Sequence, residues 1–218
     1  MSQTRERPRT KSLPGKHDVL LKPISRVSDG GHVDWGFREA GARFGPCGRW
    51  SHLAEGYRRA GDAVVGAALG EGGADVLVFP AVFLYRHYIE LQLKSHVEQL
   101  HEMGFTGERR TVDHNLCGLW RRLREALGDF GSNLPSDAIS STERLIGEIG
   151  GLDRGSYSFR YGEDKSGNDL LKGTHSVDMR NLRDVMEKLD NFFTALDQEI
   201  NDEQEVQQDL NDYLDPSE

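Results

Sequence analysis

Apolar side chains recur at the 3.6-residue period of an α-helix along most of this chain, and alternation typical of β-strands is almost absent. Two helical stretches are expected between Trp35 and Leu69, separated near Gly45-Pro46. The glycine-rich run 70–73 predicts the end of the second stretch. Further helices are expected over 76–102, 114–127 and 135–149, and from 179 to about 200.

Small and polar residues predict where these helices begin and end. Asp113 is expected to cap the third of the regular helices, and Ser176 or Asp178 is expected to cap the last. Gly150-Gly151 is expected to stop the helix before it. The connection 150–175 is long for a compact domain, and loops of this length often carry functional residues.

These elements predict an all-α protein, an up-and-down bundle of four to five helices with disordered termini. Residues 1–26 hold seven Lys or Arg and two acidic residues, whereas residues 197–218 hold nine acidic residues and no Lys or Arg. We therefore expect a disordered basic arm over 1–30, a helical bundle over 31–200 and an acidic tail over 201–218. The tail is expected to be solvated, with masking of a basic groove or imitation of nucleic acid as the alternative.

Composition and short motifs exclude several classes of protein and of binding site. The chain has no apolar run long enough for a membrane span and no apolar signal core near its start. Its two cysteines, Cys47 and Cys117, lack zinc spacing and are typical of reduced thiols, which predicts a cytoplasmic protein. Neither common glycine-rich nucleotide loop is found, and no metal or cofactor is expected.

The helix over 76–102 carries charges within its own apolar face. With Arg86 placed at the centre of that face, Glu90 lies about 40° and Lys94 about 80° around the helix, because successive residues are roughly 100° apart. Apolar residues also lie on the opposite side, which predicts a position in the middle of the bundle. A charge at such a position is costly unless it is paired and hydrogen-bonded.

Three interpretations of these charges stay open. Arg86 and Glu90 could form a structural i,i+4 ion pair, with Lys94 extending outward to solvent. Alternatively, the three side chains line a cleft that receives an anion, because the planar donors of arginine suit phosphate. A third possibility is an interface between copies of the chain.

Three segments together resemble the HEPN superfamily of helical-bundle proteins. The helix segment Phe83-Leu-Tyr-Arg-His-Tyr-Ile-Glu-Leu-Gln-Leu-Lys94 is similar to the Glu-x-x-x-Lys helix of bacterial members. The segment Arg110-Thr-Val-Asp-His-Asn-Leu116 is similar to the start of that family's next helix, and Phe159-Arg160-Tyr161 to an Arg-Tyr motif before the final helices. The resemblance covers about residues 75–200.

The resemblance implies a function in nucleic-acid chemistry. HEPN proteins bind nucleotides or RNA, and many are dimeric, metal-independent RNases of toxin–antitoxin and phage-defence systems. Those RNases carry an Arg and a His with four to six residues between them, a spacing that Arg109 and His114 satisfy. The sequence departs from the pattern because Arg109 lies in a predicted loop, and His175 precedes Arg180 in the reverse order.

The sequence thus predicts a HEPN-like protein that binds RNA or a nucleotide phosphate, as a component of a bacterial stress or defence system and as a homodimer. Arg86, Lys94 and Arg160 are expected to contact phosphate, while Glu90 orients Arg86. His114 with Arg109 forms the candidate catalytic pair, and Tyr161 is expected to stack or hydrogen-bond. The alternative function is a non-catalytic, dimerising module whose charged tails contact a protein partner.

Overall fold

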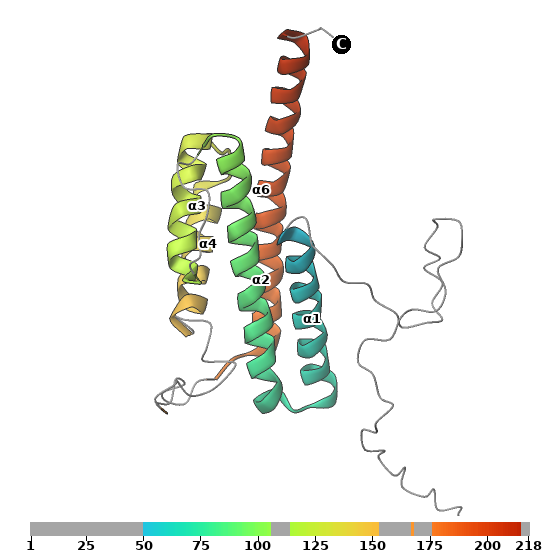
Figure 1. Cartoon of the computed structure of the whole chain (residues 1–218). Coiled ribbons are helices and arrows are strands. Elements are labelled where there is room, and N and C mark those ends of the chain that lie inside the picture. The colour runs from blue at the N-terminus through green and yellow to red at the C-terminus, as the bar shows by residue number, and fades with distance from the viewer. Residues whose placement is uncertain (1–49, 106–113, 153–166, 168–175, 215–218) are drawn as a thin grey trace, which may run out of the picture. The chain divides into compact units, whose positions relative to one another are not determined.

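The computed structural model describes residues 50–105, 114–152, 167 and 176–214, and every regular element in this part of the chain is an α-helix (Figure 1). The prediction of an all-α bundle is therefore confirmed. The first helical stretch expected after Trp35, the basic arm 1–30 and most of the long connection lie outside the described residues. The helices are α1 (Trp50–Glu71), α2 (Ala74–Glu102), α3 (Leu116–Phe130), α4 (Ser136–Leu152) and α6 (Met179–Leu214).

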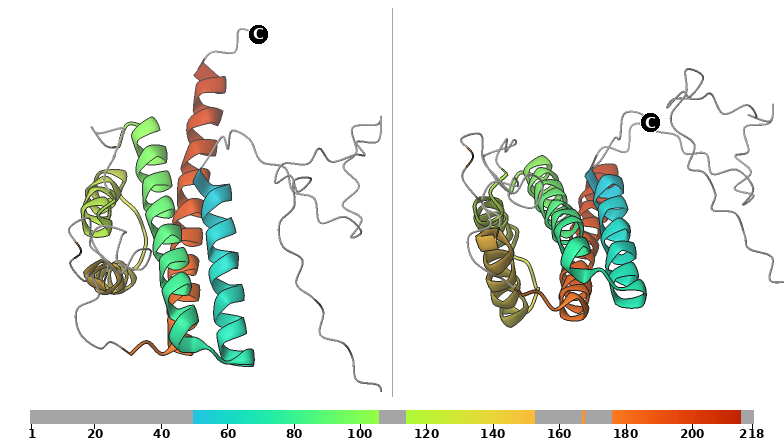
Figure 2. Two further views of the ribbon diagram at one scale, coloured as in Figure 1. Left: turned by 60° about the horizontal axis from the view of Figure 1, so that its bottom comes forward. Right: turned by 90° about the horizontal axis from the view of Figure 1, so that it is seen from below.

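Helix α2 lies at the centre of the bundle, as its two apolar sides predict. It contacts α1 on one side, α3 on the other and α6 as well, and Figures 1 and 2 show this arrangement from three directions. Gly61 of α1 lets the first two helices approach closely, because a Cβ atom there would lie 2.6 Å from Cε1 of Tyr85. This close packing buries Tyr85 and keeps the polar side chains of α2 enclosed.

Helix α3 starts two residues later than predicted. Its cap is Asn115, whose side-chain oxygen accepts hydrogen bonds from the backbone N–H groups of Cys117 and Gly118. The expected cap, Asp113, lies outside the described residues. His114 is consequently the residue just before the cap, outside the helix, where its backbone carbonyl is free to accept bonds from another element.

Helix α4 does not stop at Gly150-Gly151 as expected, but continues to Leu152. The reason is packing: a Cβ atom at Gly150 would lie 3.3 Å from Sγ of Cys117. The glycine therefore serves as a close contact with α3 inside a helix, and its low helix propensity is offset by that approach.

Helix α6 begins as predicted, because Asp178 caps it by accepting from the N–H groups of Arg180 and Asn181. It then runs to Leu214, so the prediction that this helix ends near residue 200 is wrong, and the acidic segment 201–214 is helical. Within the described residues, none of the helices is long and apolar enough to cross a membrane.

Candidate functional site

Three basic residues singled out from the sequence meet around the carboxylate of Glu90 in the middle of α2. Its Oε2 accepts a hydrogen bond from Nη1 of Arg86 at 2.9 Å. Its Oε1 lies 2.7 Å from Nζ of Lys94 and 2.7 Å from Nδ1 of His114. One buried anion is therefore contacted by three basic side chains from two segments that are distant in the sequence.

The backbone before α3 is tied to the same site. Nη2 of Arg86 donates to the carbonyl oxygen of His114 at 2.5 Å, while the following residue, Asn115, caps α3. Arg86 thus links the carboxylate of Glu90 to the backbone of His114. Glu90 in turn binds the imidazole ring of the same histidine. This closed set of contacts fixes the position of the imidazole from both its backbone and its Nδ1 atom.

The electrostatics favour an ionised Glu90. Burial by itself raises the pKa of Glu90, but the hydrogen bonds from Lys94, Arg86 and His114 outweigh burial and hold that pKa below its usual range. An ionised carboxylate only accepts hydrogen bonds, so the Nδ1 atom of His114 carries a proton. In the neutral imidazole, the Nε2 atom then holds the lone pair that can accept a proton from a ligand.

Exposure separates the four side chains into two groups. Arg86 and Glu90 are each only 1% exposed, and Lys94 is 12% exposed, whereas the His114 side chain is 59% exposed. Of the three interpretations that the sequence left open, the structure shows the Arg86–Glu90 ion pair, and Lys94 turns toward Glu90 instead of extending out to solvent. A ligand from solvent therefore meets His114 first and can touch Lys94 only at its edge.

Arg109, Arg160 and Tyr161 lie outside the described residues. Among the residues that the structure describes, no group of three or more His, Cys, Asp or Glu is arranged to hold a metal ion.

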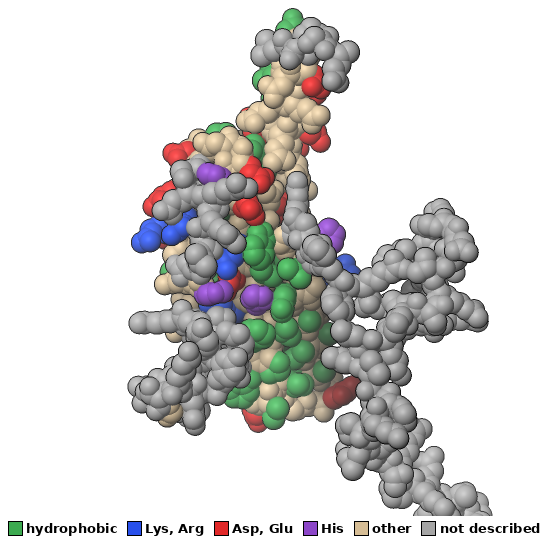
Figure 3. Space-filling model, in the orientation of Figure 1, with side chains coloured by type: hydrophobic (Ala, Val, Ile, Leu, Met, Phe, Trp, Pro, Cys, Tyr) green, Lys and Arg blue, Asp and Glu red, His purple; other side chains and the backbone are tan. Residues whose placement is uncertain are grey.

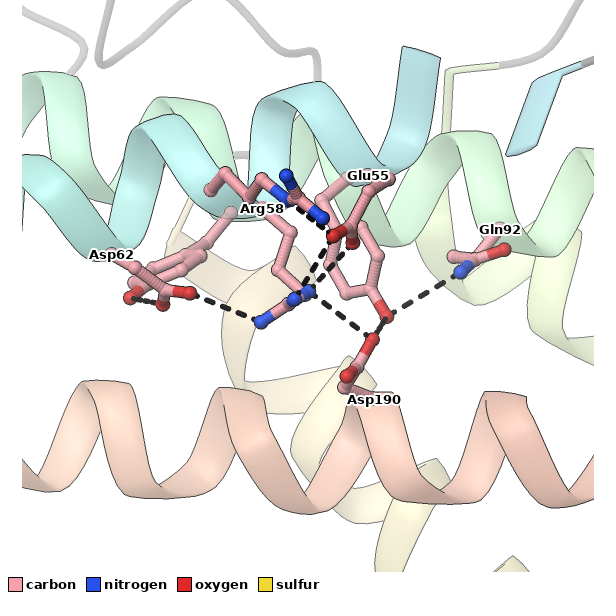
Figure 4. A network of polar contacts seen from close by, with 8 residues as sticks. Glu55, Arg58, Asp62, Gln92 and Asp190 are labelled. Carbon is pink, nitrogen blue, oxygen red and sulfur yellow. Dashed lines mark hydrogen bonds and ion pairs between the residues drawn. The ribbon is translucent and has the colours of Figure 1, made fainter. Parts of the chain in front are cut away.

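A second charged cluster, which the sequence reasoning missed, lies where α1, α2 and α6 meet (Figure 4). Arg58 of α1 contacts Glu55 at 2.9 Å and Asp62 at 3.0 Å, and it lies 3.4 Å from Asp190 of α6. The i,i+3 and i,i+4 spacing on α1 was the available signal for the first two contacts. We call this group the Arg58 cluster.

Two buried tyrosines of α2 complete the Arg58 cluster. The hydroxyl of Tyr85 donates to Asp62, and that of Tyr88 donates to Asp190, each at 2.7 Å. Burial, followed by these hydrogen bonds, raises the pKa of both tyrosines, so the hydroxyls stay protonated donors. The cluster borders a surface hollow of about 360 Å³. Its polar atoms satisfy one another, which is typical of a structural network.

Comparisons of the chain with protein-family models, with curated proteins and with solved structures found no match. The resemblance to HEPN proteins therefore stays a prediction that rests on the residues themselves.

Proposed function

We propose that this chain is a HEPN-like protein that binds RNA or nucleotide phosphate and uses His114 for general acid–base chemistry. The observation that carries the proposal is an exposed imidazole whose Nδ1 atom lies 2.7 Å from a buried carboxylate. A carboxylate in this position holds the imidazole in one orientation and leaves Nε2 directed away from the carboxylate.

The charge of the site suits an anionic ligand. Glu90 contributes one negative charge, while Arg86 and Lys94 contribute two positive charges, so the group is net positive even with a neutral His114. Because the group is largely screened from water, this charge acts more strongly on a nearby phosphate than it would in bulk solvent.

The reaction to test is metal-independent cleavage of RNA. Nε2 of His114 takes the proton of a ribose 2′-hydroxyl, and the 2′-oxygen forms a bond to the adjacent phosphorus. The bond between phosphorus and the 5′-oxygen breaks, and the leaving oxygen takes a proton from water. The products are a 2′,3′-cyclic phosphate and a 5′-hydroxyl, and the protonated His114 neutralises the hydroxide that remains.

Burial changes the role proposed for Arg86. At 1% exposure it cannot reach a phosphate in this conformation, so we assign it, together with Glu90, to positioning His114. Lys94 lies at the edge of the site. After His114, it is the most exposed of the three basic side chains that contact Glu90. Roles in phosphate binding for Arg160 and in stacking for Tyr161 remain part of the proposal, as does Arg109 as a partner of His114.

The resemblance extends the proposal to the biological setting. HEPN RNases act as dimers in bacterial defence and toxin–antitoxin systems, and we propose a cytoplasmic homodimer with such a role for this chain. Hydrophobic side chains gather over α1 and α2 in Figure 3, and Leu69, Val76 and Phe79 near the α1–α2 turn are exposed. An exposed apolar surface of this kind is typical of protein contacts.

The decisive experiment incubates the full chain with a short single-stranded RNA in EDTA. Replacing His114 with Ala is expected to reduce cleavage about 100-fold or more, the usual contribution of a general acid–base group. The matched control is His52→Ala, which removes an exposed histidine on α1 and is expected to change the rate less than twofold. DNA of the same sequence, which lacks the 2′-hydroxyl, is expected to stay intact.

Equal cleavage by the wild type and His114→Ala contradicts the catalytic assignment. If neither protein cleaves, RNA affinity measured by fluorescence anisotropy separates the remaining outcomes. Affinity that falls with Lys94→Gln supports a binding role without catalysis. Absence of RNA binding favours the alternative function, a non-catalytic interaction module, for which the enclosure of Arg86 and Glu90 is the favouring observation.

A further inference from the structure

The last part of α6 projects past the other helices of the bundle (Figures 1 and 2). Of residues 201–213, none is buried, and three large apolar side chains are exposed to solvent. Val206 is 52% exposed, Leu210 is 55% exposed and Tyr213 is 82% exposed. Their i, i+4, i+7 spacing places them in one stripe along the helix.

This stripe continues the face by which α6 packs inside the bundle. Val206 and Leu210 lie two heptads beyond Phe192 and Leu196, which are both buried, and Phe192 contacts the ring of Trp120 in α3 at 5.9 Å between centroids. Two heptads rotate the face by only about 40° on a straight helix. The face on which Phe192 meets Trp120 is thus left open where α6 projects past the bundle.

The bundle ends at a definite point along this face. Glu199 accepts hydrogen bonds from Oγ of Ser132 and the N–H of Asn133, in the connection between α3 and α4. Ile200 is the last buried residue of α6, and every described side chain from 201 onward is at least partly exposed. A projecting helix with an uncovered apolar stripe gains stability when a partner covers that stripe.

The acidic residues beside the stripe indicate which kind of helix can bind it. If Val206, Leu210 and Tyr213 occupy the seam of a heptad pattern, the flanking g positions are Asp202 and Asp209, both exposed. Residues 197–218 hold nine acidic residues and no Lys or Arg. A second copy of this helix would bring the same charges to the contact, whereas a helix with Lys or Arg beside its apolar seam would pair with them.

We propose that residues 201–214 of α6 form a docking surface for an amphipathic helix of a partner protein with basic residues flanking its apolar stripe. The apolar seam supplies the contact area, and the acidic flanks select the partner and exclude self-pairing. This surface is independent of the site at Glu90, so its test does not depend on RNA binding or cleavage.

The test uses two synthetic helical peptides that share a Leu seam at heptad positions a and d. One carries Lys at positions e and g, and the other carries Glu there. Fluorescence anisotropy with the full chain is expected to show binding of the Lys peptide and at least tenfold weaker binding of the Glu peptide. Binding of the Lys peptide is expected to weaken as salt screens the flanking charges.

Two matched variants locate the binding surface. Leu210→Ser is expected to weaken binding of the Lys peptide at least tenfold, whereas Gln208→Ser, at an exposed residue on the opposite side of α6, is expected to change it less than twofold. Both replaced side chains are exposed, so the circular dichroism spectrum and melting temperature are expected to stay unchanged.

Four results overturn the proposal. The first is that the Lys peptide does not bind, and the second is that Leu210→Ser binds it as well as the wild type does. The third is a dimer of the chain in analytical ultracentrifugation that Leu210→Ser abolishes, since a second copy would then be the occupant. Tight binding of both peptides also contradicts selection by charge.

Discussion

Two charged clusters contact α2, and their charge arrangements are opposite. Around Glu90, one carboxylate receives bonds from Arg86, Lys94 and His114, and both members of the central ion pair are 1% exposed. In the Arg58 cluster, one arginine lies among three carboxylates, and the Arg58 side chain is 25% exposed.

The difference in exposure decides what each cluster can do. Water screens the Arg58 cluster and can replace any one partner, so the cluster contributes modestly to stability and fixes how α1, α2 and α6 meet. Water cannot replace Arg86 as the partner of Glu90, because both side chains are closed to solvent, which makes that group both more costly to disrupt and more rigid. Rigid positioning of an exposed imidazole is what acid–base chemistry requires.

The largest effect is expected from Glu90→Ala. This change removes the buried carboxylate that binds Arg86, Lys94 and His114 and is expected to lower the free energy of unfolding by about 3–5 kcal/mol. Urea unfolding at pH 7, followed by circular dichroism, measures the change. A loss below about 1 kcal/mol, the range of surface pairs, would mean that the two clusters do not differ as proposed.

The double variant Arg86→Leu with Glu90→Leu sharpens the comparison. Replacing a buried ion pair with apolar residues is often neutral or stabilising, so the double variant is expected to recover most of the stability lost in Glu90→Ala. It also removes the carboxylate that holds Nδ1 of His114, so RNA cleavage is expected to stay low. Stability as low as that of Glu90→Ala would contradict a simple ion-pair account.

Acid is expected to destabilise the wild type more than the double variant Arg86→Leu with Glu90→Leu. Because the folded pKa of Glu90 lies below its unfolded value, its contribution to stability is complete above the unfolded value and is lost as the pH falls through the folded value. The unfolded value is about 4.3. Unfolding free energies measured between pH 7 and pH 3 are expected to fall more steeply below that value in the wild type than in the double variant. Parallel curves would exclude Glu90 as a source of the acid sensitivity.

In the Arg58 cluster, Asp190→Ala is expected to have a smaller effect. The buried hydroxyl of Tyr88 keeps only its 3.5 Å contact with Gln92, which is expected to cost about 1–2 kcal/mol. Tyr88→Phe provides the matched comparison, since it removes the hydroxyl that needs a partner. A cost for Asp190→Ala as large as that for Glu90→Ala would remove the distinction between the clusters.

The smallest effect is expected from Arg59→Ala. Arg59 contacts Glu55 at the outer edge of the Arg58 cluster, and its side chain is 75% exposed. The melting temperature is expected to be nearly unchanged, because exposed pairs gain little after side-chain entropy and screening by water. A clear drop in melting temperature would show that the cluster behaves as one cooperative network.

The position of α2 in the bundle could be predicted from its own residues. Apolar side chains on two sides of the helix indicated a central position, and the spacing of Arg86 and Glu90 indicated an ion pair, because both features depend only on helical geometry. The family resemblance, in contrast, supplied His114 as a companion of that helix. The helical period of α2 alone contains no information about a residue in another segment.

Elements that depend on contact with another helix were harder to predict. The sequence suggests that Gly150 ends α4, but its role is to admit Cys117 of α3. Acidic residues after Ile200 suggest an unstructured tail, yet α6 continues to Leu214 because the helix is already nucleated by its packed part. The Arg58 cluster joins side chains from α1, α2 and α6, a combination that sequence spacing reveals only within α1.

By itself, the sequence determined the all-α class, and it narrowed the cap of α6 to Ser176 or Asp178 and made an ion pair within α2 one of three interpretations, because each follows from hydrogen bonding and periodicity over a few residues. Only the tertiary structure decided that Lys94 and His114 share Oε1 of Glu90 and that Arg86 is closed to solvent. Burial and long-range contact depend on how helices pack, and packing is a property of the whole bundle. The same reason leaves the apolar stripe of α6 uncovered above the α3–α4 connection.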